Sequence, residues 1–364
     1  QIDVRNLPPQ APHLRHQTAR GNGHPAVGEL QTITVDHDLN SRNNIVEMPE
    51  KINRYVYEKS MFIQKMQEMA LPKNICELAA QRLKNNFVYG ELCDCLEHCA
   101  ANPLLNEQEK EMLPQVIWLA RSHYEVSFSP DTVIAERVIF PVSYRETKGI
   151  EDVRLVRFVD DAGTSTYYGT YTAYNGVSIL PKILETKDFY NFKISPIHGP
   201  HVQNKGLAFF PRKIKGRYAM MARMDGVNNY IMYSNDIYVW PEKAILLQEP
   251  VYPWEFIQVG NCGSPLETPL GWLLITHGVG PMRQYCLGAT LLDLEDPTKI
   301  IGRLKEPLLI PNADEREGYV PNVVYSCGSI INGDDLIIPY GMSDYCSSYA
   351  VVPLKSLLSE LTRS

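Results

Sequence analysis

A repeat in the C-terminal part of this sequence constrains its fold more than any other feature. Four segments open with polar residues and run into an apolar stretch, and they start at residues 149, 204, 260 and 317. Each start lies 55 to 57 residues after the previous one. A period of this size among short strands is typical of a β-propeller with about four strands in each blade. The sequence therefore shows four blade-like units.

Strand patterns dominate the chain from about residue 133 onward. Short apolar runs bounded by Gly, Pro, Asp or Asn indicate strands. The predicted strands cover 136–143, 153–159, 166–174, 216–224, 229–234, 271–279, 285–294 and 335–342. A helical pattern follows only at 354–362. We therefore predict that residues 126–364 form an all-β propeller.

The first third of the chain has a different character. Residues 1–44 are rich in Pro, Gly, His and Asn and predict an extended arm with one strand at 30–35. Residues 45–125 carry apolar side chains at three- and four-residue spacing, which predicts a helical insertion or lobe. The predicted helices begin near Pro49, cover 74–87 and 89–101, and begin again at Asn106, whose side chain can cap a helix.

Charge and composition exclude several classes of protein. Lys and Arg number 35 against 42 Asp and Glu, a net charge of -7, whereas nucleic-acid binders carry a basic surface. No run approaches the roughly 18 apolar residues of a membrane helix, and no secretory signal is visible in residues 1–20. Eight cysteines are spread through the chain without a disulfide-scaffold spacing. We expect a cytoplasmic protein with reduced thiols.

Polar residues at the repeat openings are the candidate functional groups. The inner strands of a propeller start near its central channel, so the first polar residues of each blade are expected to meet at one mouth. The openings supply Glu151, Asp152, Arg154, Asn204, Lys205, Asn261 and Asn322, and the ends of the second strands add Arg223, His277, Arg283 and Asp344. The expected pocket is lined by Tyr171, Tyr174, Tyr319 and Tyr340.

Several long motifs resemble glycoside hydrolase family 130. They are GIEDVRLVRF (149–158), YYGTYTAY (167–174), the segment 203–226, GNCGSPLET (260–268), ITHGVG (275–280), EREGYVPNVVYSCG (315–328) and IIPYGMSD (337–344). The resemblance covers the chain from about residue 124. It implies a five-bladed β-propeller that acts as a β-mannoside phosphorylase or β-mannosidase. The strands of the fifth blade, the first in chain order, could come from 30–35 and 136–143, or from sequence upstream of residue 1.

The resemblance also implies roles for individual residues. Asp152 would be the general acid, protonating the glycosidic oxygen through the mannose 3-hydroxyl, and Asp344 would hydrogen-bond the mannose. Phosphate would be held by Lys205, His277 and Arg154 or Arg223, with Arg283 added because it follows His277 closely. The expected substrate contacts are Glu151, Asn204, Asn261, Tyr319, Asn322, Tyr340 and Asp344.

Elementary chemistry separates two enzymatic alternatives. Inverting cleavage needs an acid for the leaving oxygen and a nucleophile on the opposite face. A hydrolase needs a second carboxylate to activate water, for which Glu317 and Glu267 are candidates, whereas a phosphorylase needs cations that hold phosphate. The Arg, Lys and His set favours inverting phosphorolysis of a β-mannoside oligosaccharide to α-mannose 1-phosphate. Inorganic phosphate is then the co-substrate, and no metal or organic cofactor is expected.

Less specific interpretations stay open. The chain could be a non-catalytic propeller that binds glycans, and the helical region could pack on the propeller or mediate homo-oligomers. A Glu151–Arg154 ion pair, a core His277 or a turn-capping Asp344 would each be structural. The cluster from Cys93 to Cys99 contains ligand types that suit zinc, but small buried apolar side chains on a helix explain it better.

Overall fold

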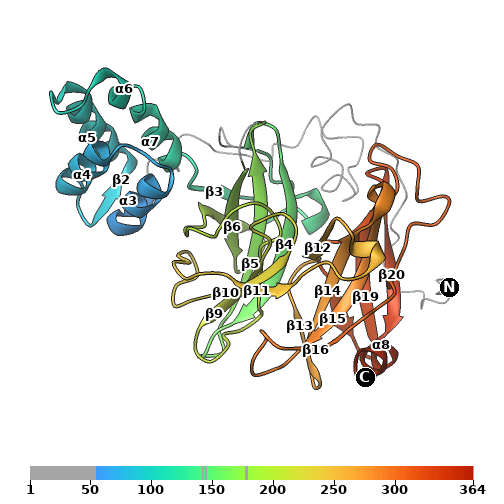
Figure 1. Cartoon of the computed structure of the whole chain (residues 1–364). Helices are drawn as coiled ribbons and strands as arrows, with labels where there is room; N and C mark the ends of the chain where they lie inside the picture. The colour runs from blue at the N-terminus through green and yellow to red at the C-terminus, as the bar shows by residue number, and fades with distance from the viewer. Residues whose placement is uncertain (1–54, 142, 144–145, 177–178, 364) are drawn as a thin grey trace.

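The computed structural model describes residues 55–141, 143, 146–176 and 179–363. Figure 1 shows a helical lobe beside a set of antiparallel sheets that follow one another in chain order. The arm predicted for residues 1–44, including the strand at 30–35, lies outside the described residues. No helix in the described part of the chain is long and apolar enough to cross a membrane.

Five helices and a two-stranded sheet form the helical lobe. They are β1 (Val56–Glu58), α3 (Lys59–Glu68), α4 (Lys73–Arg82), β2 (Asn86–Val88), α5 (Tyr89–Ala101), α6 (Glu107–Lys110) and α7 (Leu113–Ala120). The Glu58 side chain accepts hydrogen bonds from the backbone N–H groups of Ser60 and Met61, which fixes the start of α3. Asn106 caps α6 as predicted. The helix predicted for 74–87 is too long, because Asn86–Val88 pairs with β1 instead.

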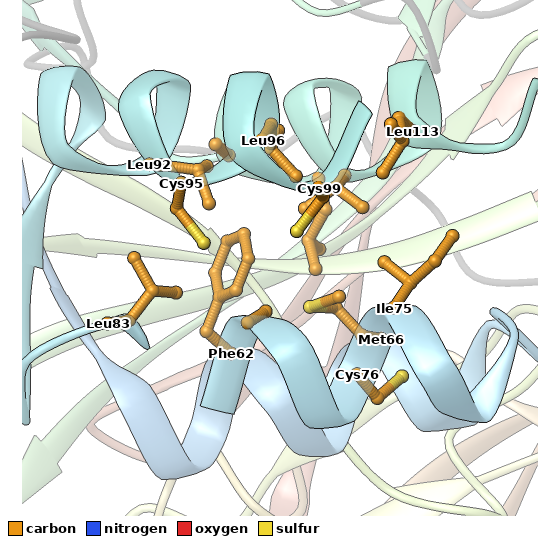
Figure 2. Close-up of a cluster of buried hydrophobic side chains, with 14 of the residues drawn as sticks. Phe62, Met66, Ile75, Cys76, Leu83, Leu92, Cys95, Leu96, Cys99 and Leu113 are labelled. Atoms are coloured by element: carbon orange, nitrogen blue, oxygen red, sulfur yellow. The ribbon is translucent and has the colours of Figure 1, made fainter. Parts of the chain in front are cut away.

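The interior of the lobe is an apolar core. Figure 2 shows Leu92, Cys95 and Cys99 of α5 directed toward Phe62 and Met66 of α3. Two contacts link the lobe to the sheets: Lys65 Nζ donates to the carbonyl of Ile197 at 3.2 Å, and the Tyr55 and Ser195 hydroxyls lie 3.2 Å apart. The lobe therefore has its own core and docks beside the last strand of the first sheet.

Four antiparallel sheets follow the lobe. The first has the order β3-β7-β6-β5-β4, with β3 (Tyr124–Ser127), β4 (Ile150–Val159), β5 (Ser165–Tyr174), β6 (Ile179–Thr186) and β7 (Asn191–Pro196). The second has the order β11-β10-β9-β8, with β8 (Ala208–Phe209), β9 (Tyr218–Ala222), β10 (Asn229–Ser234) and β11 (Ile245–Gln248).

The third and fourth sheets complete the described arrangement. In the third, β12 (Gln258–Asn261) and β13 (Leu266–Thr268) both pair with β14 (Gly271–Val279), followed by β15 (Tyr285–Leu292) and β16 (Ile300–Arg303). In the fourth, β17 (Val324–Tyr325) and β18 (Ile330–Asn332) pair with β19 (Asp335–Met342), which pairs with β20 (Cys346–Pro353). The helix α8 (Leu354–Leu361) packs against the last two sheets.

Successive sheets pack face to face. Val156 and Ile183 of the first sheet share a cluster with Phe209 and Met220 of the second. Similar clusters join the second sheet to the third and the third to the fourth. The sheets therefore succeed one another as the blades of a propeller do, and each of the four repeat units corresponds to one sheet.

One sequence prediction fails between residues 134 and 143. The strand predicted for 136–143 is absent from the described residues there, because Ile134–Glu136 is a 3-10 turn and 137–141 has no regular structure. A segment becomes a strand only when its backbone pairs with the edge of a neighbouring strand. No described strand pairs with residues 137–141. The described part of the chain therefore contains four blade-like sheets.

Candidate active site

The repeat openings converge because each lies on the edge strand of its sheet. The strands β4, β8, β12 and β17 each end one sheet, and the polar residues of the four openings lie on or beside them. Side chains more than 170 residues apart meet there: Arg154 Nη2 donates to Tyr325 Oη at 2.5 Å, joining the first sheet to the fourth. The edge-strand placement is the one that the repeat predicted.

Asp152 sits on a β-bulge of β4. Glu151 pairs with Thr172 and Arg154 with Thr170, so Asp152 and Val153 face a single partner residue. The φ angle of Asp152 is 60°, in the left-handed region that a side chain rarely adopts. Bulges redirect a side chain, and such strained residues gather at functional sites. The bulge therefore fixes the direction of the Asp152 carboxylate.

Arg154 is buried directly behind this carboxylate. Its side chain is 2% exposed, and Nη2 lies 3.9 Å from Asp152 Oδ2. The Nε atom of Arg154 has no hydrogen-bond partner in the structure. A buried N–H without an acceptor is costly, which indicates that a ligand or water supplies the acceptor.

Lys205 and Asn204 come from the opening of the second unit. Lys205 Nζ forms an ion pair with Glu151 Oε1, next to Asp152. Asn204 has a φ of 63° and its side-chain oxygen accepts from the N–H of Lys205. Arg154, Asn204 and Lys205 line a narrow crevice between the first two sheets, together with Tyr171. Two predicted cations and Asn204 therefore border the same crevice.

Arg223 and His277 form a pair between the second and third sheets. Arg223 Nη1 donates to His277 Nε2 at 2.9 Å. Arg223 also donates to the side-chain oxygen of Gln258 at 2.9 Å, and its Nε atom lacks a partner. Gly260 makes this approach possible, because a Cβ there would lie 2.3 Å from the His277 ring. Asn261, next along β12, donates to the carbonyl of Gly206 at 2.6 Å.

His277 is neutral rather than cationic in this arrangement. A guanidinium only donates, so Nε2 of His277 must carry a lone pair. Burial lowers the pKa of His277 well below its usual range, and Arg223 and Arg154 lower it further. The expectation that His277 supplies positive charge is therefore corrected. The fixed charges of this part of the site are the two arginines.

Asp344 lies near enough to the same acids and to Arg283 to interact with them electrostatically. Burial raises the pKa of Asp344, and the negative charges of Asp152 and Glu151 raise it further, while Arg283 opposes the shift. Asp344 and Arg283 both have left-handed φ angles, 51° and 56°. Asp152, Asn204 and Asn322 share this property, so five of the predicted site residues are held in strained backbone.

Other predicted groups lie elsewhere. Tyr340 packs in the core between the last two sheets and donates to Glu315 Oε1 at 2.8 Å, so its phenol is structural. Tyr319 is 69% exposed. The candidate base Glu267 pairs with Arg212 at 2.7 Å, where both side chains are about two-fifths exposed, and Glu317 is exposed. Strand alternation sets the direction of Tyr340 and Glu267, whereas Tyr319 and Glu317 lie in the segment before β17.

The predicted pocket residues Tyr171 and Tyr174 also differ in what their side chains contact. The Tyr171 hydroxyl donates to Glu146 Oε1 at 2.8 Å, in a buried group with Lys182 and Tyr124, while its side chain lines the crevice. Tyr174 donates to the carbonyl of Gly176 at the end of its strand. Only Tyr171 therefore borders the crevice.

Sequence reasoning missed two residues beside Asp152. Tyr325 Oη lies 3.4 Å from Asp152 Oδ2, and Cys327 Sγ lies 3.8 Å from Asp152 Oδ1. Tyr325 ends β17 and Cys327 follows it, so the fourth opening located this part of the chain, but no periodic signal marks these two side chains as neighbours of Asp152. Cys262 Sγ lies 3.7 Å from His277 Nδ1, but burial raises the pKa of this thiol to about 12, so it stays protonated.

The cysteine cluster of α5 belongs to the lobe core. Cys95 and Cys99 are buried there, while the exposed His98 ring contacts the carbonyl of Asp94 at 2.8 Å. Among the residues that the structure describes, no three His, Cys, Asp or Glu side chains are placed to hold a metal ion. The cysteines pack as small apolar side chains, as preferred from the sequence.

Comparison with known proteins identifies the family. The family model described as beta-1,4-mannooligosaccharide phosphorylase matches residues 106–363, which is most of the chain. The chain belongs to glycoside hydrolase family 130. The match begins after α5, so the first three helices of the lobe lie outside the part that defines the family.

Relatives in glycoside hydrolase family 130 agree with this match. A 1,2-beta-oligomannan phosphorylase of Thermoanaerobacter sp. is 34% identical over 66% of this chain and 81% of its own length. A beta-1,2-mannobiose phosphorylase of Listeria innocua is 32% identical over 61% of this chain and 63% of its own. The solved structure of a Listeria innocua beta-1,2-mannobiose phosphorylase with beta-1,2-mannobiose superposes with a TM-score of 0.54, at 29% identity over 64% of this chain and 65% of that chain.

Proposed function

We propose that this chain is an inverting β-mannoside phosphorylase. It would use inorganic phosphate to cleave a β-mannosyl linkage at the non-reducing end and release α-mannose 1-phosphate. Support comes from the family, from relatives that are named as phosphorylases, from Arg154 beside Asp152, and from the buried pair of Arg223 and His277. The chain spans 63% of the length of the Listeria relative, so the activity of the whole protein is part of the proposal.

The reaction balances with the groups present. A phosphate oxygen attacks C1 of the mannose from the face opposite the leaving sugar, and the bond from C1 to the glycosidic oxygen breaks. Asp152 supplies the proton that this oxygen takes up, through the mannose 3-hydroxyl as the family resemblance implies. One displacement inverts the β linkage to an α-phosphate. Phosphate is already a nucleophile, so the step requires no activated water.

The unpartnered Nε atoms of Arg154 and Arg223 carry the proposal. Both guanidinium groups are buried, and each keeps one N–H without an acceptor. Planar guanidinium groups bind phosphate oxygens with parallel hydrogen bonds, which a bound sugar or water molecule matches less well. Two such groups in a chain of net charge -7 favour an anionic co-substrate. Lys205 and Arg283 would add charge at the margin, while neutral His277 would contribute a hydrogen bond.

The remaining predicted groups would bind the sugar. Asp344 is held between the acids at 151 and 152 and Arg283, where its raised pKa suits a carboxyl that exchanges hydrogen bonds with sugar hydroxyls. Asn204, Asn261, Asn322 and Glu151 offer further donors and acceptors around the same mouth. Exposed Tyr319 is free to contact the leaving sugar.

We also propose that the four sheets are part of a five-bladed propeller, as the family resemblance implies. The described residues contain four sheets, and the match covers 65% of the solved Listeria chain. The fifth blade would complete the ring.

Sugar release with and without phosphate tests the proposed reaction. Purified protein is incubated with β-1,2-, β-1,3- and β-1,4-mannobiose, and free mannose and mannose 1-phosphate are both measured. Phosphorolysis predicts mannose 1-phosphate that appears only with phosphate and has the α configuration by NMR. Equal release of free mannose in both conditions would instead identify a β-mannosidase. Binding of a mannobiose without any turnover would identify a glycan-binding propeller.

A further inference from the structure

Tyr325 lies between the two charged groups that the reaction uses. It is the last residue of β17, on the fourth sheet, while Asp152 and Arg154 belong to the first. Arg154 Nη2 is 2.5 Å from Tyr325 Oη, and Oη is 3.4 Å from Asp152 Oδ2. The phenol oxygen therefore bridges a buried cation and the proposed general acid.

The direction of these hydrogen bonds follows from chemistry. The guanidinium has no acceptor, so Tyr325 Oη accepts from Arg154 and must direct its own proton elsewhere. Asp152 Oδ2 is the acceptor within reach. Burial raises the pKa of Tyr325 well above its usual range, although Arg154 opposes this shift, so the phenol stays protonated and able to donate. The chain of donors runs from Arg154 through Tyr325 to Asp152.

The contact from Tyr325 can hold the Asp152 carboxylate in place on its strained bulge. Asp152 has a φ of 60° and its side chain is only 12% exposed, so the direction of the carboxylate depends on the groups packed around it. Tyr325 reaches one oxygen and Cys327 Sγ approaches the other, and both come from the fourth sheet. At 3.4 Å the Tyr325 contact is long, but catalytic hydrogen bonds are often long before substrate binds. An error of about 1 Å in the placement of a reacting group costs roughly a hundredfold in rate.

We propose that Tyr325 is a positioning residue, which fixes Asp152 Oδ2 against the Arg154 guanidinium so that Oδ1 faces the substrate. This inference rests on the proposed phosphorolysis and assigns Tyr325 no contact with the reacting atoms. A donor to a carboxylate stabilises its ionised form, so we expect the loss of Tyr325 to move the pH dependence of the reaction. The titratable or charged groups that face Asp152 are Glu151, Arg154, Cys262, Tyr325, Cys327 and Asp344.

The pH dependence of Tyr325→Phe tests this role. Activity falls on the alkaline side when the acid loses its proton. Loss of the phenol donor makes that proton harder to remove, so the alkaline limb of kcat/KM moves up by about half a pH unit or more. We expect kcat to fall about ten- to hundredfold. Titration of the phosphate itself affects wild type and variant equally and cancels in the comparison.

Tyr238→Phe is the matched control. Tyr238 is partly buried and donates to Glu185 Oε2 at 2.5 Å, so the change removes a tyrosine-to-carboxylate bond outside the site. Its pH profile and kcat should equal those of the wild type. A wild-type profile and rate in Tyr325→Phe would overturn the positioning role. Absence of phosphate-dependent turnover in the wild type would overturn the proposed function instead.

A second substitution covers the case in which Tyr325→Phe does not fold. Site-specific replacement of Tyr325 by 3-fluorotyrosine keeps the hydroxyl and makes it a stronger donor. The alkaline limb should then move to lower pH, opposite to the shift in the Phe variant. An unchanged limb in folded, active fluorotyrosine protein would contradict the proposal.

Discussion

The interior of the helical lobe is apolar, whereas the interior where the inner strands meet is charged. Phe62, Met66 and Ile75 fill the lobe core, and among the described side chains of residues 55–122, Trp118 apart, no buried N or O atom lacks a partner. In the candidate site, the buried Arg154 and Arg223 each retain an unpartnered N–H, and the backbone is strained at several of the predicted site residues. Both regions are buried, so burial alone does not separate stability from function. The two regions differ instead in whether their buried polar atoms have hydrogen-bond partners.

Removal of the proposed general acid should give the largest effect. Asp152→Asn keeps the size of the side chain but cannot deliver the proton, so we expect a loss of at least about a hundredfold in the rate of mannose 1-phosphate formation. The midpoint of thermal unfolding should change little, because the bulge and its backbone pairing remain. Initial rates and a thermal unfolding curve check this. Formation of mannose 1-phosphate by Asp152→Asn at the wild-type rate would show that Asp152 is not the general acid.

Arg223→Met tests whether the charged interior serves binding at the expense of stability. Loss of this guanidinium should lower kcat/KM for phosphate by about a hundredfold or more. The apolar side chain removes a buried charge but leaves His277 Nε2 without its donor, a cost of about 1–3 kcal/mol, so the two effects oppose each other and the free energy of unfolding should change little. Phosphate kinetics and urea unfolding measure the two effects.

Arg212→Met is the matched control for this change. Arg212 pairs with Glu267 at a half-exposed position, and such pairs contribute about 0–1 kcal/mol. Its phosphate kinetics should equal those of the wild type. If Arg223→Met and Arg212→Met lowered kcat/KM for phosphate equally, buried Arg223 would have no specific role in binding phosphate.

The lobe core should show the reverse pattern. Phe62 is 2% exposed and packs against Tyr57 and Phe87, so Phe62→Ala should lower the free energy of unfolding by about 3–5 kcal/mol. At a temperature where the variant stays folded, kcat should be unchanged. Leu104→Ala, at a position 70% exposed in the same lobe, should change neither quantity. A large fall in kcat for folded Phe62→Ala protein would mean that the lobe core supports catalysis.

Sequence patterns predicted the two regions unequally. The 55- to 57-residue spacing located the inner strand of each sheet, because every unit repeats the same succession of turn and strand. The same reasoning placed Tyr340 in the pocket, although strand register turns it into the core. Tyr325 and the bulge at Asp152 were not predicted, since contacts between the first and fourth sheets and a φ of 60° leave no periodic signal. In the lobe, β1 and β2 were missed because each is only three residues long.

The smallest predicted effect concerns His123, at the junction of the two regions. Burial lowers the pKa of this histidine to about 3, against 6.5 for an ordinary histidine. Between these values the unfolded chain binds a proton that the folded chain does not, so the stability contributed above pH 6.5 is lost as the pH falls toward 3. His123→Phe keeps a ring against Tyr55 and Tyr57 but removes this titration. Its free energy of unfolding should therefore fall less steeply below pH 6.5, by up to about 1.4 kcal/mol per pH unit. Urea unfolding at pH 7, 6 and 5 measures the slopes, and His98→Gln, on the exposed face of α5, should keep the wild-type slope. Identical slopes for wild type and His123→Phe would show that His123 is protonated in the folded protein, and the junction would then belong with the charged interior.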